Sequence, residues 1–399
     1  MAEKQNTPEI RFEGFTDPWE QRKFSDLTDR VSIQSSDSDL PQVEYEDIVS
    51  GEGTLNKDLR DKEGGKTGIK FYAGDVLYGK LRPYLMNWLY PQFNGVAVGD
   101  FWVLRATKCD SSFLYRLIQT NNFQRLANVS SGSKMPRADW NLISQSFFAV
   151  PADHAEQKAI AKSLAELDSL ITLHQRKYDK LCTVKKSMLD KMFPKLGETE
   201  PEIRFEGFTD PWEQRKLGEL CTFSKGHGYS KADIRDAGTP LILYGRLYTQ
   251  YESRIEEVDT FTVEQDGSIL SRGNEVIVPA SGETAEDIAI ASSVRRSGII
   301  LGGDLNVVTP TGKLDPDYTA LAITYSKAHD DLAKRAQGKS VVHVHGNDIA
   351  EVEISYPSES EQKRISSVVL NLDSLITLHQ RKLELLRNIK KSLLDRMFV

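Results

Sequence analysis

Two long stretches of the chain carry apolar residues at alternating steps of four and three. The first has its seam positions at Ile160, Leu164, Leu167, Ile171, His174, Tyr178, Leu181, Lys185, Met188 and Met192. The second has them at Ile365, Val369, Leu372, Ile376, His379, Leu383, Leu386, Lys390, Leu393 and Met397. A mean spacing of about 3.5 residues is typical of helices that supercoil around a partner, whereas a stripe of an ordinary globular core prefers about 3.6. We therefore predict helices at 156–194 and 358–399 that pair with each other in antiparallel fashion.

Shorter patterns indicate two domains of mixed α/β structure, at residues 1–155 and 195–357. Strand-like runs lie at 74–82 and 98–107 before a helical stretch from Ser111, and at 275–281 and 298–310 before a helix that begins at Asp315-Pro316. Aspartate is a good helix cap, and proline suits the first helical position. The predicted fold class is α+β, with two globular domains separated by a long antiparallel two-helix coiled coil and related by a pseudo-twofold repeat.

The chain repeats itself at both edges of these domains. The stretch PEIRFEGFTDPWEQRK occurs at 8–23 and again at 201–216, and LDSLITLHQRK occurs at 167–177 and 372–382. Between these constant blocks the two halves differ almost completely. The order is thus constant, variable, constant, twice over, which is the pattern of a molecule that must make one set of contacts twice.

Composition narrows the function. The net charge is −7, and residues 200–356 carry 16 Lys and Arg against 26 Asp and Glu, so we expect weak DNA affinity for the chain without partners. The three cysteines are scattered without a C-x-x-C pair, which fits a reducing cytoplasm. No apolar run is long enough to span a bilayer, so no membrane contact is expected.

No catalytic motif is present. Gly338-Lys339-Ser340 lacks the upstream glycine of a phosphate-binding loop, and His343 with His345 lacks a third metal ligand. Cationic and polar residues instead gather near strand ends and glycine turns. The candidates for DNA contact are Lys80, Arg82, Lys134 and Arg137 in the first variable region, and Lys225, Arg246, Ser281, Thr284, Lys339, Ser340 and His343 in the second. Such side chains read base edges and hold phosphates, although an ordinary solvated surface has the same composition.

The whole plan resembles the DNA-specificity subunit of type I restriction–modification systems. The resemblance rests on the FEGFTDPWEQRK starts, the VP…EQK and YP…EQK exits, the LDSLITLHQRK helix in both halves, and KLRPY in the first variable region. It covers nearly the whole chain. It implies that each variable region is a target-recognition domain that reads one half of a bipartite site in double-stranded DNA.

The resemblance also implies partners. The two helices would act as the spacer between the half-sites and as the docking surface for two methyltransferase subunits, which use S-adenosylmethionine. Restriction subunits would join them and use ATP with Mg²⁺. This chain would itself be non-catalytic and hold no cofactor.

Three other interpretations compete with this one. A coiled-coil scaffold with two protein-binding adaptor domains is favoured by the negative charge. A fused single-chain restriction enzyme would need a methyltransferase or nuclease motif. A stand-alone repressor would need a helix-turn-helix or a basic helix.

Overall fold

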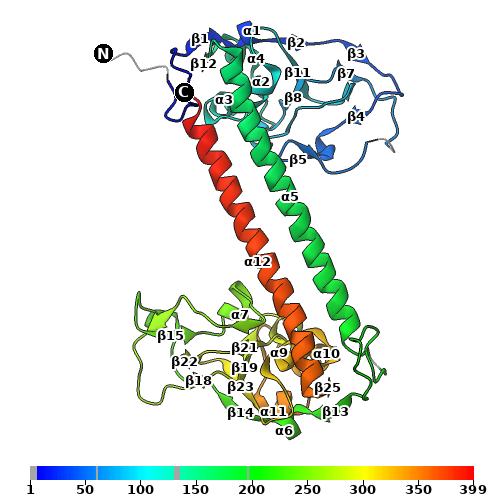
Figure 1. The fold of residues 1–399 in the computed structure, drawn as a ribbon, viewed down its shortest axis with the longest axis vertical. Coiled ribbons are helices and arrows are strands. Elements are labelled where there is room, and N and C mark those ends of the chain that lie inside the picture. Colours follow the sequence, from blue (N-terminus) through cyan, green and yellow to red (C-terminus); the bar gives the residue numbers. More distant parts are fainter. Residues whose placement is uncertain (1–6, 60–61, 130–134, 196) are drawn as a thin grey trace. The chain divides into compact units, whose positions relative to one another are not determined.

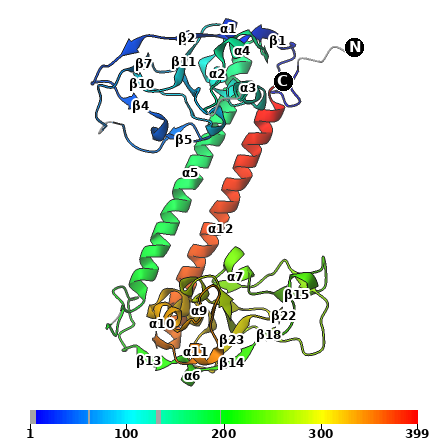
Figure 2. The same ribbon diagram turned by 180° about the vertical axis from the view of Figure 1, so that it is seen from behind.

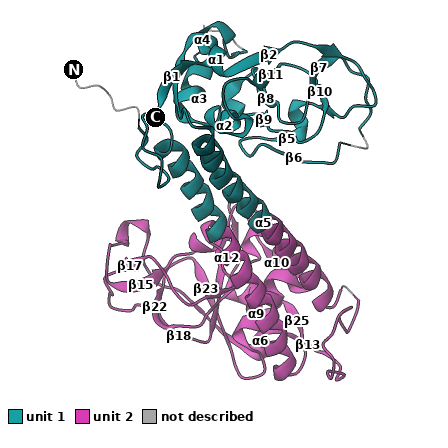
Figure 3. Cartoon of the chain, turned by 45° about the horizontal axis from the view of Figure 1, so that its top comes forward, with its two compact units in different colours: residues 1–175, 381–399 teal, residues 176–380 magenta. Residues whose placement is uncertain are grey.

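The computed structural model describes residues 7–59, 62–129, 135–195 and 197–399. The chain forms two compact units, which are coloured separately in Figure 3: unit 1 holds residues 1–175 and 381–399, and unit 2 holds residues 176–380. Figure 1 shows two long helices, α5 (His154–Met192) and α12 (Glu359–Arg396). One part of each helix belongs to unit 1 and the other part to unit 2, as the colours of Figure 3 show. The division therefore cuts through both helices, whereas the sequence-based division gave each helix a segment of its own.

Unit 1 is built on two four-stranded sheets. One has the order β2 (Thr28–Val31), β11 (Phe101–Ala106), β8 (Val76–Gly79), β9 (Trp88–Leu89), and the other β3 (Gln34–Ser35), β7 (Gly68–Phe71), β10 (Gly95–Ala97), β4 (Gln42–Val43). Two further pairs are β1 (Glu20–Lys23) with β12 (Phe147–Val150) and β5 (Ile48–Val49) with β6 (Thr54–Leu55). The short helices are α1 (Phe24–Leu27), α2 (Ser111–Leu117), α3 (Asn121–Ala127), α4 (Trp140–Gln145), and the 3₁₀ turns η1 (Tyr45–Asp47) and η2 (Pro83–Leu85).

Unit 2, whose strands are labelled in Figure 2, is likewise built on two sheets, one of which has a fifth strand. A five-stranded sheet has the order β14 (Cys221–Lys225), β23 (Leu305–Pro310), β19 (Glu275–Pro279), β21 (Ser292–Val294), β16 (Arg254–Ile255), and a four-stranded sheet β17 (Phe261–Thr262), β15 (Thr239–Ile242), β22 (Ser297–Leu301), β18 (Leu270–Arg272). The two-stranded pairs are β13 (Glu213–Lys216) with β25 (Glu353–Tyr356) and β20 (Ser281–Gly282) with β24 (Val342–His343). The helices are α6 (Leu217–Leu220), η3 (Lys231–Asp233), α7 (Arg246–Thr249), α8 (Ala285–Ile288), α9 (Pro316–Tyr325), α10 (Lys327–Arg335) and α11 (Gly346–Ala350).

Local capping explains where the helices differ from the sequence-based expectation. The Asp315 side chain accepts from the amides of Asp317 and Tyr318, so the predicted start of this helix is confirmed. The prediction of one continuous helix from Ser111 was wrong, because the structure has two helices, α2 and α3. Thr120 begins a second helix because its hydroxyl accepts from the Phe123 amide. The run 298–310 is likewise two strands, because Gly302, Gly303 and the left-handed Asp304 (φ 57°) form a turn between them.

The constant blocks make matching contacts in the two units. Glu156 accepts from the Arg11 guanidinium at 2.7 and 2.9 Å in unit 1, and Glu361 accepts from Arg204 at 2.8 and 2.9 Å in unit 2. Both glutamates are buried. A buried carboxylate needs such a charged partner, so each unit closes its entry segment onto the start of its own long helix in the same way.

Within each unit, an ion pair connects α5 to α12. In each case it joins a lysine of the seam on one helix to an aspartate next to the seam on the other helix. Lys390 Nζ lies 2.7 Å from Asp168 Oδ1 in unit 1, and Lys185 Nζ lies 2.5 Å from Asp373 Oδ1 in unit 2. Asp168 and Asp373 are the same position of the repeat, as are Lys185 and Lys390. The partners are thus exchanged between the two copies of the repeat. Every seam position named from the sequence is buried or partly buried.

The end of each long helix is anchored in a core. Phe193 packs against Tyr318 in unit 2, with ring centroids 5.9 Å apart, and Phe398 packs against Phe113 in unit 1 at 5.3 Å. No helix among the described residues is long and apolar enough to cross a bilayer.

Candidate nucleic-acid interface

In unit 1, the segment after β8 pairs with the segment before α4. The Arg82 amide donates to the Pro136 carbonyl at 2.8 Å, and the Ala138 amide donates to the Lys80 carbonyl at 2.8 Å. Leu81 and Arg137 form an antiparallel bridge. We call residues 80–86 and 135–138 the first loop pair. It brings together Lys80, Arg82 and Arg137, while Lys134 lies outside the described residues.

Asp100 organises the cations of the first loop pair. One carboxylate oxygen lies 3.5 Å from Lys80 Nζ and the other lies 3.0 Å from an Arg137 terminal nitrogen. The Tyr45 hydroxyl donates to the Asp100 carbonyl at 2.5 Å and accepts from the Leu81 amide at 3.1 Å. Burial raises the pKa of Tyr45 to about 12, so this hydroxyl keeps its proton at neutral pH. Arg137 remains 55% exposed, and its charge is available to a ligand.

In unit 2, β20 and β24 form the equivalent arrangement. Ser281 lies opposite His343 in the ladder, and the backbones of Gln337 and His343 exchange two hydrogen bonds of 3.0 and 2.8 Å. These bonds close a loop that presents Lys339 and Ser340 to solvent. We call residues 280–284 and 337–344 the second loop pair. It unites Ser281, Lys339, Ser340 and His343.

Thr284 and Lys225 lie at the margins of the second loop pair. The Thr284 hydroxyl caps α8, because it accepts from the Asp287 amide at 3.1 Å and donates to the Asp287 carboxylate at 2.7 Å. Lys225 is exposed at the end of β14, opposite Asn306, whose side-chain amide donates to the Val344 carbonyl at 2.9 Å.

Arg246 lies apart from the second loop pair. Its side chain is only 9% exposed, and its terminal nitrogens contact Asp259 at 2.7 Å and Glu252 at 2.9 Å. These contacts give Arg246 a structural task at the start of α7. A DNA contact by this residue stays a prediction, and it would require these ion pairs to be exchanged for a phosphate or a base.

The two loop pairs occupy the same frame. Each joins the exit of a central strand, β8 or β19, to the segment that leads toward the final strand of its domain. Each central strand starts at a buried carboxylate that holds the preceding turn. Asp75 accepts from the Tyr72 amide at 2.8 Å, and Glu275 accepts from the amides of Arg272 and Gly273 at 2.8 and 3.0 Å. The two loop pairs therefore share one backbone arrangement, but the side chains on it differ.

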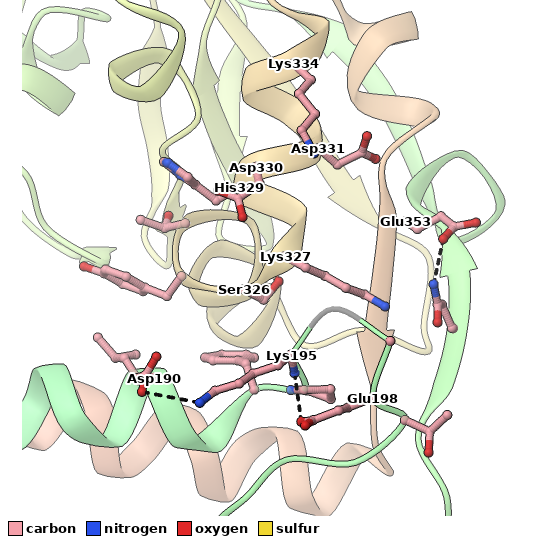
Figure 4. Close-up of a pocket in the computed structure, with 18 of the residues that line it drawn as sticks. Asp190, Lys195, Glu198, Ser326, Lys327, His329, Asp330, Asp331, Lys334 and Glu353 are labelled. Carbon is pink, nitrogen blue, oxygen red and sulfur yellow. Dashed lines mark hydrogen bonds and ion pairs between the residues drawn. The ribbon is translucent and has the colours of Figure 1, made fainter.

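An open hollow of about 950 Å³ also lies in unit 2, between the end of α5 and the start of α10 (Figure 4). Its wall mixes charges of both signs, from Lys195, Lys327 and Lys334 and from Asp190, Glu198 and Asp331. Lys195 Nζ lies 3.9 Å from the Asp190 carboxylate. No loop-pair residue lines this hollow. Within the described ranges, no group of three His, Cys, Asp or Glu residues could hold a metal ion.

Sequence reasoning missed one part of the first loop pair. The side chains of Tyr84, Leu85 and Met86 are exposed at its tip. In a sequence, consecutive apolar residues usually indicate a buried segment. The one indication that these three are exposed is their position directly after Lys80 and Arg82 in KLRPY.

Comparisons with known proteins identify the family of the chain. Residues 17–182 and 209–388 match the family model described as the type I restriction modification DNA specificity domain. A specificity subunit of the type I restriction enzyme MjaVIII from Methanocaldococcus jannaschii is 20% identical over 334 residues, which cover 81% of this chain and 75% of that protein. The specificity subunit of type I enzyme EcoDI from Escherichia coli is 26% identical over 197 residues, which cover 47% and 44%.

Solved structures share the fold. The S subunit of a type I restriction–modification system from M. genitalium superposes with a TM-score of 0.61 at 14% identity, over 98% of this chain and 99% of that one. A chain from a structure of type I complex assembly and conformational transition gives a TM-score of 0.50 at 16% identity, over 95% and 97%.

Proposed function

Because the chain belongs to the family of type I restriction–modification DNA specificity subunits and carries the family's domain in both halves, we propose that each variable domain reads one half of a bipartite DNA site through its loop pair. The main support for this proposal is that the two loop pairs share one backbone arrangement but present different side chains. The shared backbone would approach DNA in the same way in both units, and the different side chains would select different sequences.

The chemistry of the loop pairs suits this role. The first offers arginine and lysine, which pair with guanine edges and phosphates, and the second offers serine, histidine and one lysine, which suit shorter contacts. The two half-sites would then differ, and the whole site would be asymmetric.

The long helices would set the gap between the half-sites and receive two methyltransferase subunits. Support comes from exposed leucines that the seam does not use. Leu170 and Leu173 are 44% and 46% exposed, and their repeats Leu375 and Leu378 are equally exposed. The eleven-residue block that contains them is identical in both copies, although the helix differs on either side of it. Both copies of the repeat therefore expose the same pair of leucines, which suits two copies of one partner that each dock on one pair.

We assign the chemistry to those partners. S-adenosylmethionine would be bound by the methyltransferase subunits, and ATP with Mg²⁺ by restriction subunits. This chain would contribute sequence recognition and geometry.

A methylome tests the proposal. The chain would be co-expressed with its methyltransferase subunit in a host without DNA methylation, and N6-methyladenine would be mapped across the genome. We expect one bipartite motif with a fixed gap. An unmodified genome, with the assembled complex present, would contradict the proposal.

Variants sharpen this test. Arg82→Ala should relax the sequence preference in one half of the motif, and His343→Ala in the other half only. Arg125→Ala, an exposed residue of α3 outside both loop pairs, is the matched control and should leave the motif unchanged. Relaxation of both halves by either single loop-pair variant would contradict a separate role for the two domains.

A further inference from the structure

The tip of the first loop pair is an exposed apolar turn. Tyr84, Leu85 and Met86 are 54%, 39% and 41% exposed. The part of the chain that the structure describes contains no other run of three consecutive large apolar residues with such exposure. Met135, from the opposite segment of the loop pair, is 45% exposed. Contiguous apolar surface of this kind marks a contact site.

The turn is held rigidly. Pro83–Leu85 forms η2, and both flanking residues, Arg82 (φ 51°) and Met86 (φ 53°), adopt the left-handed conformation that non-glycine residues rarely accept. The Leu85 amide donates to the Arg82 carbonyl at 2.9 Å, and the Met86 amide donates to the Pro83 carbonyl at 2.9 Å.

Neighbouring segments fix this geometry from both sides. The Gly51 amide donates to the Met86 carbonyl at 3.0 Å, and the Ser50 hydroxyl donates to the Leu85 carbonyl. On the other side, the Arg82 amide is bonded to Pro136. A turn ordered in advance loses little freedom when it contacts a partner.

Three cations lie beside the apolar tip, and two of them are paired with Asp100. Arg82 is exposed at the start of the turn, and Lys80 and Arg137 lie on the paired segments beside it. An apolar centre with a polar rim also occurs in protein–protein interfaces. The tip, however, belongs to the loop pair proposed to read DNA, where a base-pair step offers an apolar stack directly flanked by phosphates for the neighbouring cations. This position favours DNA as the occupant.

We propose that the turn Arg82–Met86 is a wedge that inserts between two base pairs of the first half-site, with Tyr84 and Leu85 against the opened step and Arg82 and Arg137 on the flanking phosphates. This inference rests on the proposed function. Apolar wedges of this kind unstack a step and kink the duplex. Part of the specificity would then come from how easily the step deforms, which favours flexible pyrimidine–purine steps.

The second loop pair has no such tip. At the matching place, Ser281 and Gly282 are buried in β20, and Thr284 caps α8. The wedge thus makes the two halves unequal, and the distortion is confined to the half-site of unit 1.

The test uses the full chain assembled with its methyltransferase subunits, without S-adenosylmethionine, on a duplex that carries the mapped motif. 2-Aminopurine replaces one base at a time in the first half-site, at positions other than the methylated adenine, so that base flipping for methylation is not measured. We expect a fluorescence increase at one step. The variant Tyr84→Ser/Leu85→Ser should lose this increase and bind the site roughly tenfold more weakly.

Phe147→Ser is the matched control, because Phe147 is 56% exposed on β12, away from the loop pair, and it should keep both signals. The thermal midpoint of each variant checks folding. Specific binding without any unstacked step in this half-site would overturn the wedge and leave the proposed function intact. A double variant that keeps its thermal midpoint but no longer assembles with the methyltransferase subunits would assign the turn to a protein contact and overturn the wedge. Absence of specific binding by the assembled wild-type complex would overturn both.

Discussion

At the scale of single residues, Glu156 and Glu361 have the clearest structural task. Their side chains are 2% exposed, and each is paired with an arginine that is 15% or 14% exposed. Loss of one member of such a pair leaves a poorly solvated charge. We expect Glu156→Gln and Glu361→Gln to lower the free energy of unfolding by about 3 kcal/mol each, measured by denaturant titration.

Glu359→Gln is the control, because this glutamate pairs with Lys363 on the exposed surface of α12. Its midpoint should match that of the wild type. A large effect in unit 1 and none in unit 2 would show that the constant blocks do not share one task.

Glu44 and Asp47 bind Lys57, Lys62 and Lys66 in unit 1 and make these contacts sensitive to acid. Burial raises the pKa of Asp47, but hydrogen bonds from Lys57, Lys62 and the Glu44 amide outweigh this effect, so the pKa lies below its ordinary value. Lys62 and Lys66 lower the pKa of Glu44. Groups with depressed pKa values stabilise the fold above their ordinary values of about 3.9 and 4.3, and this stability is lost as pH falls through the depressed values.

Replacement of Glu44 and Asp47 by their amides should cause the same loss of stability at neutral pH. We expect Glu44→Gln/Asp47→Asn to become sensitive to trypsin at Lys57 and Lys62 at pH 7, as the wild type becomes sensitive to pepsin in acid. Glu63→Gln removes an exposed carboxylate beside Lys62 in the sequence and should stay resistant. Equal cleavage of both variants would argue against the ion pairs.

How much of the site the sequence could predict also depends on single residues. Lys80, Arg82 and Arg137 were chosen because cations next to glycine turns and strand ends tend to be exposed, and the structure brings them together, while their contact with DNA stays a prediction. Arg246 has the same local pattern, yet it is buried by Glu252 and Asp259. Only the folded path of residues 246–259 brings those carboxylates onto it, and no periodicity records that path.

At the scale of elements, the seam was predictable because helical periodicity depends on local spacing alone. Burial at Leu167 and Leu372 follows the 4-3 pattern. The strand ends were predicted less well, because the turn signal Gly302-Gly303 within 298–310 was overridden by the apolar residues on both sides of it.

The exchanged ion pairs of the long helices give a quantitative prediction. Lys185, Lys390, Asp168 and Asp373 have side chains between 14% and 27% exposed. We expect double-mutant cycles of Lys→Met with Asp→Asn to yield a coupling energy of about 1 kcal/mol in each unit. The two values need not agree, because Asp168 also pairs with Arg116, whereas Asp373 also accepts from the Ser253 hydroxyl. Strict additivity in either cycle would mean that the contact does not stabilise the helix pair.

At the scale of the whole molecule, the helices can be shortened in matched or unmatched ways. Removal of residues 178–184 shifts one helix by about 10 Å relative to the other, so Asp168–Lys390 and Lys185–Asp373 cannot both form. We expect that single deletion to abolish assembly. Removal of 178–184 and 383–389 together should preserve both pairs, keep the exposed leucines of both repeats, and shorten the gap of the methylated motif by about 3 base pairs, without changing either half-site.

The methylome of the doubly shortened chain checks this prediction. A deletion of Pro194–Thr199, outside both helices, is the control for the loss of residues as such. An unchanged gap with full methylation in the doubly shortened chain would end the role of the helices as a spacer.

The entry segments of the two units have a consequence for the order of the chain. The Ile203 amide donates to the Lys191 carbonyl at 2.9 Å, where entry segment and helix end are consecutive in the sequence. The Ile10 amide donates to the Arg396 carbonyl at 3.0 Å, where they are the two extremes of the chain. The contacts match, although the chain connects the helix end to the entry segment directly in unit 2 and not in unit 1. We therefore expect the protein to tolerate circular permutation between these two points. A gene that joins Val399 to Thr7 by a short linker and opens at Gly197 should yield a protein with the same thermal midpoint and the same methylated motif, and a permuted chain that does not fold would show that the two joints are unequal.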